Sequence, residues 1–115
     1  MTIYALASGS SKSGIGVIRI SGPDTKKVIS KLTNGSFPKP RIATLKKINK
    51  INNNELIDEG IIIWFPGPQS YTGEDMAEFH VHGSRSVIDA IHSSISKIEN
   101  CKMAEPGEFT KIAFQ

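Results

Sequence analysis

Three side chains that could act together, Glu78, His80 and His82, occupy alternate positions in the segment 76–82. Because the segment alternates apolar and polar residues, we predict a strand with these three on one face and Ala77, Phe79 and Val81 on the other. Glu and His are common metal ligands, so the face could form a metal site. The alternative is a polar outer face or a hydrogen-bonded cleft wall. With no further Cys or Asp at ligand spacing, we expect no metal.

A second candidate is the glycine- and serine-rich stretch Gly9–Gly16, GSSKSGIG. A phosphate-binding P-loop requires Gly-x-x-x-x-Gly-Lys-Ser/Thr, in which the lysine reaches the phosphates and the hydroxyl holds magnesium. Gly9 and Gly14 have the correct spacing, but Ile15 and Gly16 replace the Lys-Ser/Thr pair. The dinucleotide fingerprint Gly-x-Gly-x-x-Gly also fails, since Gly14 leads into a strand and not a helix. We expect a flexible or ligand-contacting loop, whose Gly14 and Gly16 would let backbone approach a ligand closely.

Arg19 is the only charged residue of the apolar strand predicted at Gly16–Ile20. Alternation places it beside Val17 on one face. An arginine there pairs with a carboxylate, binds an anion, or is simply exposed at a sheet edge, because its donors need partners once they leave water. The pattern alone leaves these three open.

Two other reactive residue types give weaker indications. Serine–histidine nucleophilic catalysis is possible by residue count, but the chain lacks the Gly-x-Ser-x-Gly elbow. Cys101 is the single cysteine, so it forms no internal disulfide and shares no metal with a second cysteine. We expect a buried or bystander thiol.

The composition is typical of one globular domain, with 115 residues, 38% hydrophobic and 22% charged. The net charge of +3 permits weak attraction to nucleic acid but is common among proteins that never contact it. The longest apolar run, residues 60–65, is too short for a membrane helix, and the N-terminus lacks a signal-peptide pattern. We therefore expect a cytoplasmic protein without a membrane partner.

The predicted elements alternate between strands and helices. We expect strands at 3–6, 16–20, 42–48, 56–65, 76–82 and 102–104, with a polar hairpin loop at 49–55. The first helix has Pro23 at its first position, carries Val28, Ile29 and Leu32 at helical spacing, and stops at Asn34-Gly35. The second is capped by Ser84 or Ser86, runs to about Ile98, and has an apolar stripe of Val87, Ile88, Ile91 and Ile95 that we expect in the core. The third begins at Pro106 with Phe109, Ile112 and Ala113 on one side. The chain reaches Gln115 without a capping pattern, so we expect it to continue. The prediction is a single α+β domain with a mixed sheet of five to six strands and two to three helices.

Six sequence blocks together resemble one family. They are Ile15–Pro23 (IGVIRISGP), Leu56–Gly60 (LIDEG), Trp64–Pro68 (WFPGP), Ser70–Asp75 (SYTGED), Glu78 with His82-Gly83, and Glu105–Thr110 (EPGEFT). In this order the blocks are similar to the N-terminal domain of the tRNA-modification GTPase MnmE, also called TrmE. The resemblance implies that residues 1–115 are a folate-binding and dimerisation domain like that of folate-dependent aminomethyltransferases, without the family's helical and GTPase domains.

Further expectations follow from the resemblance. The family binds 5-formyltetrahydrofolate, forms a homodimer, and works with MnmG to modify C5 of the wobble uridine of tRNA with a carboxymethylaminomethyl-type group. GTP, magnesium and potassium belong to the GTPase domain, so this chain is not expected to be catalytic alone. The alternatives are a stand-alone folate-dependent one-carbon transferase and a purely structural dimerisation domain.

Two residues match folate-binding positions of the family, Arg19 in the VIRISG block and Glu78 after the GED block. Two more contacts, a lysine after the EFT block and a C-terminal segment, lie beyond Gln115, so folate binding by this chain alone is expected to be weaker. The chain departs from the family at Val81–Arg85, where Gly-His-Gly-Gly is more usual, and at His80, where glutamine is common. The glutamine weakens the metal hypothesis further.

Overall fold

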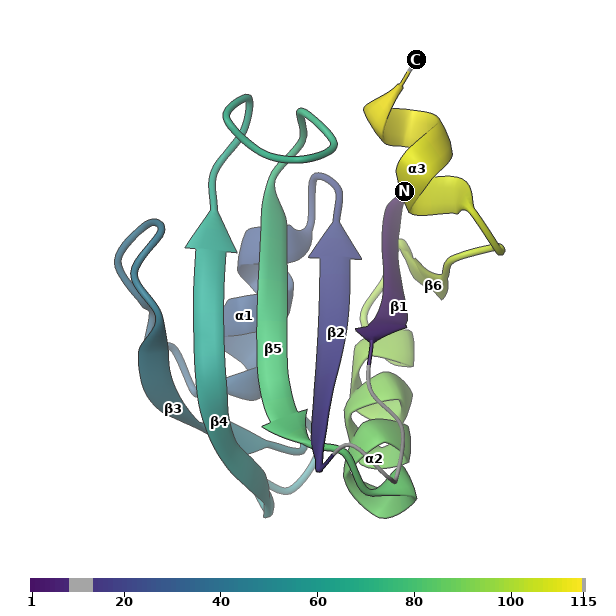
Figure 1. Cartoon of the computed structure of the whole chain (residues 1–115). Coiled ribbons are helices and arrows are strands. Elements are labelled where there is room, and N and C mark those ends of the chain that lie inside the picture. Colours follow the sequence, from purple (N-terminus) through teal and green to yellow (C-terminus); the bar gives the residue numbers. More distant parts are fainter. Residues whose placement is uncertain (9–13, 115) are drawn as a thin grey trace.

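Six strands form one mixed sheet in the computed structural model, which describes residues 1–8 and 14–114 (Figure 1). The strands are β1 (Thr2–Ser8), β2 (Ile15–Ser21), β3 (Thr44–Asn49), β4 (Leu56–Phe65), β5 (Met76–His82) and β6 (Cys101–Met103). The helices are α1 (Thr25–Leu32), α2 (Arg85–Ser96) and α3 (Glu108–Ala113). The predicted α+β domain is confirmed within these residues, and so is the hairpin between β3 and β4.

The strand order is β3-β4-β5-β2-β1-β6. Neighbouring strands are antiparallel except β1 and β6, which are parallel. This order makes β2 and β5 neighbours, although α1, β3 and β4 separate them in the sequence. The pairing sets Arg19 directly opposite Glu78.

Helices α1 and α2 cover one face of the sheet (Figure 1). Their apolar stripes recur at helical spacing, so each helix turns one side toward the strands. The residues buried between the layers include Ile18, Ile20, Ile62 and Phe79 from the strands and Val28, Ile29, Leu32, Ile88, Ile91 and Ile95 from the helices. The opposite face of the sheet, here called the open face, carries Arg19, Glu78 and His80, because strand side chains alternate between faces.

The ends of α1 follow from local hydrogen bonds. The helix begins at Thr25, so the prediction that Pro23 lies in its first turn was wrong. The Gly22 amide donates to the carbonyl of Asp75, and the Thr25 hydroxyl donates to the carbonyl of Gly22, which closes a turn before the helix starts. The predicted stop is confirmed, since Asn34 and Gly35 have φ of +52° and +81°, a conformation that favours these two residue types.

The later helices also follow the sequence closely. Ser84 caps α2 by accepting a hydrogen bond from the Val87 amide at 3.3 Å, and the helix ends at Ser96. Helix α3 forms, but it begins at Glu108 and not at the predicted Pro106, and none of its residues is buried. The helix lies near β1 and keeps some solvent exposure along its whole length (Figure 1).

Candidate functional site

Arg19, Glu78 and His80 form a charged cluster on the open face. Arg19 Nε donates to Glu78 Oε2 at 3.0 Å, and His80 Nε2 lies 3.0 Å from Glu78 Oε1. Glu78 is 19% exposed and Arg19 is 39% exposed. Of the three interpretations of Arg19, the structure supports the pairing with a carboxylate.

Two opposing effects act on the Glu78 carboxyl. Burial raises its pKa, because a partly dry site disfavours the charged form. Hydrogen bonds from His80 and Arg19, with the positive charge of both groups, outweigh burial and leave the pKa below its ordinary value. Glu78 is therefore ionised at neutral pH and presents an acceptor-only group.

Two pockets meet at Arg19. One, of about 360 Å³, is lined by Arg19, Phe65, Tyr71, Met76 and Glu78. The other, of about 340 Å³, is lined by Arg19, by residues 5–7 of β1, and by residues 104–110. Each volume lies at the lower end of the range for ligand pockets, and the shared arginine makes a single extended site possible.

The loop between β4 and β5, residues 66–75, supplies the aromatic wall of the first pocket. Hydrogen bonds hold both ends of the loop: Arg41 Nη2 donates to the carbonyls of Pro66 and Gln69 at 2.9 and 2.8 Å, and the Gly67 amide donates to Asp75 Oδ1 at 2.9 Å. The loop is also tied to β2, since the hydroxyls of Ser21 and Thr72 lie 2.7 Å apart. These contacts fix the backbone on both sides of Tyr71.

Tyr71 connects the charged cluster to the C-terminal segment. The Arg19 guanidinium lies 5.9 Å from the centroid of the Tyr71 ring, within the range of a cation–π contact. The ring also meets Phe114 edge-on, with centroids 6.5 Å apart. Tyr71 is 48% exposed and Phe114 is 79% exposed, so the Tyr71 ring beside Arg19 and the Phe114 ring that contacts Tyr71 both remain accessible.

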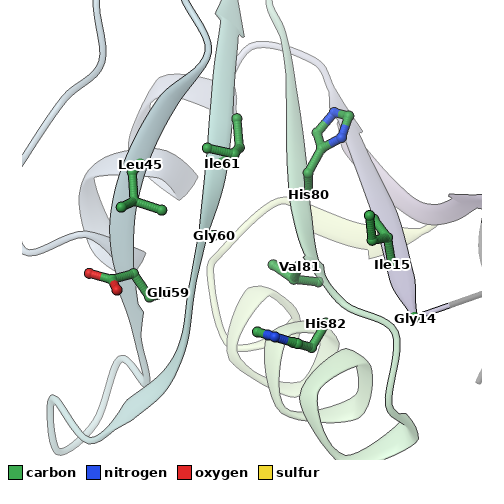
Figure 2. A pocket seen from close by; sticks show the side chains of 9 residues that line it. All are labelled: Gly14, Ile15, Leu45, Glu59, Gly60, Ile61, His80, Val81 and His82. Carbon is green, nitrogen blue, oxygen red and sulfur yellow. The ribbon is translucent and has the colours of Figure 1, made fainter.

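His82 does not join Glu78 and His80. Its backbone amide and its ring Nδ1 both contact the Asp58 carboxylate, at 2.9 and 2.8 Å. Figure 2 shows the His80 and His82 rings pointing in different directions. The predicted strand alternation is confirmed, but the three side chains do not converge, and the described residues contain no group of three metal-ligating side chains placed to hold an ion.

His82 and His80 both line a hollow of about 380 Å³ on the open face (Figure 2). Its other side-chain walls include Ile15, Leu45, Glu59 and Ile61. Gly60 also lines the hollow, and a Cβ at that position would lie 2.5 Å from the carbonyl oxygen of His80. The close approach of β4 and β5 thus requires glycine here.

Only the end of the glycine-rich stretch is described, so the predicted role of the loop stays a prediction. Residues 9–13 lie outside the described residues. Gly14 lines the hollow of Figure 2 and not the Arg19 pockets. Gly16 faces α2, where a Cβ would lie 2.8 Å from Ile88 Cδ1, so this glycine serves helix packing.

The remaining candidates stay apart from the cluster. In the described part of the chain no serine hydroxyl is hydrogen-bonded to a histidine ring, and Arg85 is exposed at the start of α2. Cys101 is partly buried, and burial raises the pKa of its thiol. None of the described helices is long and apolar enough to cross a membrane.

Sequence reasoning missed Phe65, Tyr71 and Met76 as neighbours of Arg19 and Glu78, and Phe114 as a neighbour of Tyr71. Tyr71 lies within the SYTGED block, so its aromatic side chain between turn residues was an available clue. Phe114 offered no such clue, because its contact with Tyr71 joins two segments 43 positions apart.

Comparison with known proteins identifies the family. A family described as "GTP-binding protein TrmE N-terminus" matches residues 2–115. The chain is 71% identical over 115 residues to the tRNA modification GTPase MnmE of Pelagibacter ubique. The aligned region covers 100% of this chain and 26% of that protein. It is 46% identical over 113 residues to a mitochondrial 5-taurinomethyluridine tRNA synthase subunit of Danio rerio, covering 98% of this chain and 22% of that protein.

A third relative, the tRNA modification GTPase MnmE of Beijerinckia indica, is 46% identical over 112 residues, covering 97% of this chain and 25% of that protein. The chain thus spans about a quarter of the length of these curated relatives. The family match extends across both pockets, the Arg19–Glu78 pair and the 66–75 loop. The chain belongs to the family of TrmE N-terminal domains.

Proposed function

We propose that this chain is the N-terminal module of a tRNA-modification GTPase, and that it binds 5-formyltetrahydrofolate through Arg19 and Glu78. The observation that carries the folate proposal is the Arg19–Glu78 pair between two pockets. In the whole protein the module would work with MnmG in carboxymethylaminomethyl-type modification of the tRNA wobble uridine. GTP, magnesium and potassium would be bound by the GTPase domain, and the proposed module has no chemistry of its own.

The hydrogen-bonding capacity of the pair supports this proposal. Among the described residues, Arg19 uses its Nε for Glu78, so the N–H groups on its two terminal nitrogens can bind a carboxylate or carbonyl of the cofactor. Each Glu78 oxygen accepts one hydrogen bond and has capacity for another. The carboxylate can therefore take two parallel hydrogen bonds from the ring N–H and amino group of a pterin.

The aromatic surroundings fit a flat heterocycle as well. Phe65 and Tyr71 line the same pocket as the pair. Offset or edge-on aromatic contacts contribute about 0.5–1.5 kcal/mol each beyond simple burial. The pocket thus combines apolar walls with a small number of charged groups, as most small-molecule sites do.

Calorimetric titration of 5-formyltetrahydrofolate tests the assignment. We expect Glu78→Gln and Arg19→Ala each to weaken binding by roughly 10- to 100-fold, since a hydrogen bond to a charged group is worth about 1.5–3 kcal/mol. Asp58→Asn is the matched control, because it alters the other carboxylate–histidine pair of the same face. Unchanged affinity in both site variants would overturn the folate assignment.

We also propose that the module forms a homodimer. Ile15 and Leu45 are 58% and 60% exposed, and both line the hollow on the open face (Figure 2). Clustered exposed apolar side chains mark association surfaces. In sedimentation equilibrium we expect Leu45→Glu to shift the mass toward one monomer, while Leu56→Glu, at a 54% exposed leucine outside the hollow, leaves a dimer. A monomeric wild-type chain would exclude dimerisation through this module.

A further inference from the structure

The charges of the chain are divided unevenly along the sequence. Residues 25–54 contain eight of the 14 lysines and arginines and none of the 11 aspartates and glutamates. The rest of the chain therefore carries six basic residues against all 11 acidic ones. We call the residues of this segment the basic edge, consisting of Lys26, Lys27, Lys31, Lys39, Arg41, Lys46, Lys47 and Lys50.

The basic edge lies on one side of the fold. It runs from α1, which lies behind the sheet, through the connection to β3, the outermost strand beyond β4 (Figure 1). Within the described residues, Lys50 alone among the eight forms an ion pair, with Glu55 at 3.7 Å. Most of the other side chains are exposed, so their charge is available to a partner.

Two lysines from different elements contact neighbouring residues of the connection between α1 and β3. Lys46 Nζ of β3 donates to Ser36 Oγ at 2.6 Å, and Lys26 Nζ of α1 lies 5.8 Å from the centroid of the Phe37 ring. Phe37 packs edge-on against the buried Trp64, with centroids 5.5 Å apart. Because Phe37 packs on the core, the backbone beside both ammonium groups is held in place.

Acidic side chains lie beside two members of the basic edge, with Glu55 paired to Lys50 and Glu59 opposite Lys47 on β4. The remaining basic side chains form no ion pair within the described residues, and such a group attracts a polyanion. Lysine is a compact charge on a flexible stem, which suits contacts with phosphates whose positions vary along a backbone. Such contacts supply affinity and orientation without reading the base sequence. The acidic excess elsewhere would repel the same partner, so the field favours approach from this edge.

We propose that the basic edge binds the sugar–phosphate backbone of RNA, with Lys26 and Lys46 as central contacts. The choice of RNA over other polyanions rests on the proposed function, since the relatives are named as tRNA-modifying proteins. The site is separate from the Arg19 pockets, whose lining contains none of these eight residues. This module would then position the tRNA as well as bind the folate.

Fluorescence anisotropy with a labelled tRNA transcript tests the inference at 50 and 200 mM salt. The test protein is Lys26→Gln/Lys46→Gln, in which glutamine at 46 keeps a donor for Ser36. The control is Lys97→Gln/Lys102→Gln, which removes two exposed charges outside the basic edge. Losing two phosphate contacts should weaken binding about tenfold at the higher salt and reduce the slope of log K against log salt by about 1.4–1.8. The control should stay within about twofold of wild type.

Three results would overturn the inference: equal weakening in both double variants, no tRNA binding at 50 mM salt, or tighter binding to phosphatidylserine vesicles than to tRNA. Circular dichroism confirms that both variants are folded. Titration of 5-formyltetrahydrofolate into the same variants separates the two proposals. Loss of RNA binding with intact folate binding supports two independent sites, whereas failure of folate binding in wild type affects the Arg19 assignment alone.

Discussion

Replacing His92 with phenylalanine should stabilise the protein. His92 lies on α2, and its ring contacts Tyr4 with centroids 5.4 Å apart and planes tilted by 57°. Its Nε2 atom is buried and has no hydrogen-bond partner among the described residues. Phenylalanine keeps the ring contact and removes the buried polar atom. An unsatisfied buried polar group costs about 1–3 kcal/mol, so we expect a gain of about 1 kcal/mol after some loss from the larger ring.

The same residue makes stability depend on pH. Burial lowers the pKa of His92 from its ordinary value of 6.5, and the charge of Asp89 offsets this only in part. The unfolded chain therefore binds a proton at a higher pH than the folded chain does. Unfolding takes up that proton, so the free energy of unfolding falls as the pH decreases from about 6.5 toward the folded pKa, with a limiting slope near 1.4 kcal/mol per pH unit. His92→Phe removes this contribution.

Urea unfolding followed by circular dichroism at pH 8.0, 7.0, 6.0 and 5.5 measures both effects. We expect the variant to exceed wild type by about 1 kcal/mol at pH 8, equivalent to roughly 3–6 °C in Tm, and by more at pH 5.5. His82→Phe is the control, because that ring is 73% exposed and hydrogen-bonded to Asp58, so it should bring no gain. Parallel pH profiles for wild type and His92→Phe, or a loss of stability at pH 8, would refute the reasoning.

Two further predictions concern Gly60 on β4 and Glu78 on β5. Gly60→Ala places a Cβ 2.5 Å from the backbone oxygen of His80, so it should cost about 3 kcal/mol in urea unfolding. Gly73→Ala, at φ of +80° with open space around it, should cost only about 1 kcal/mol. Equal losses would contradict the steric account. Glu78→Gln should lower the free energy of unfolding by about 1–2 kcal/mol at pH 7. Because the folded pKa of Glu78 lies below its ordinary value, its stabilisation is present above that ordinary value and is lost as the pH falls through the folded pKa. Wild type and variant should therefore converge as the pH falls, and a constant difference would show that the ionised carboxylate is not responsible.

Sequence patterns predicted much of the fold because they depend on near neighbours. The alternation of 76–82 predicted β5, the spacing of Ile88, Ile91 and Ile95 predicted the buried side of α2, and Asn34-Gly35 predicted the end of α1. The start of α1 was misplaced because hydrogen bonds to Asp75, on a segment 50 positions away, close the turn at Gly22–Thr25. Local preference for proline in a first turn cannot include that constraint.

The candidate site was predictable in its residues but not in its geometry. The resemblance identified Arg19 and Glu78 separately, and their assignment to folate remains a prediction. Their contact depends on the pairing of β2 with β5, which no local pattern specifies, because the strands are not consecutive. The same holds for His82, which shares a strand face with Glu78 and His80 but turns to Asp58 on β4.

By itself the sequence determined the elements, the buried stripes and the family, since periodicity, turn residues and motif blocks are properties of short segments. The tertiary structure alone decided which distant side chains meet. Strand order brought Arg19 to Glu78, and the anchored 66–75 loop brought Tyr71 to Arg19. The connection from α1 to β3 placed Lys26 and Lys46 against the neighbouring residues Phe37 and Ser36. Because two helices pack on one face of the sheet, the opposite face is left to carry Arg19 and Glu78.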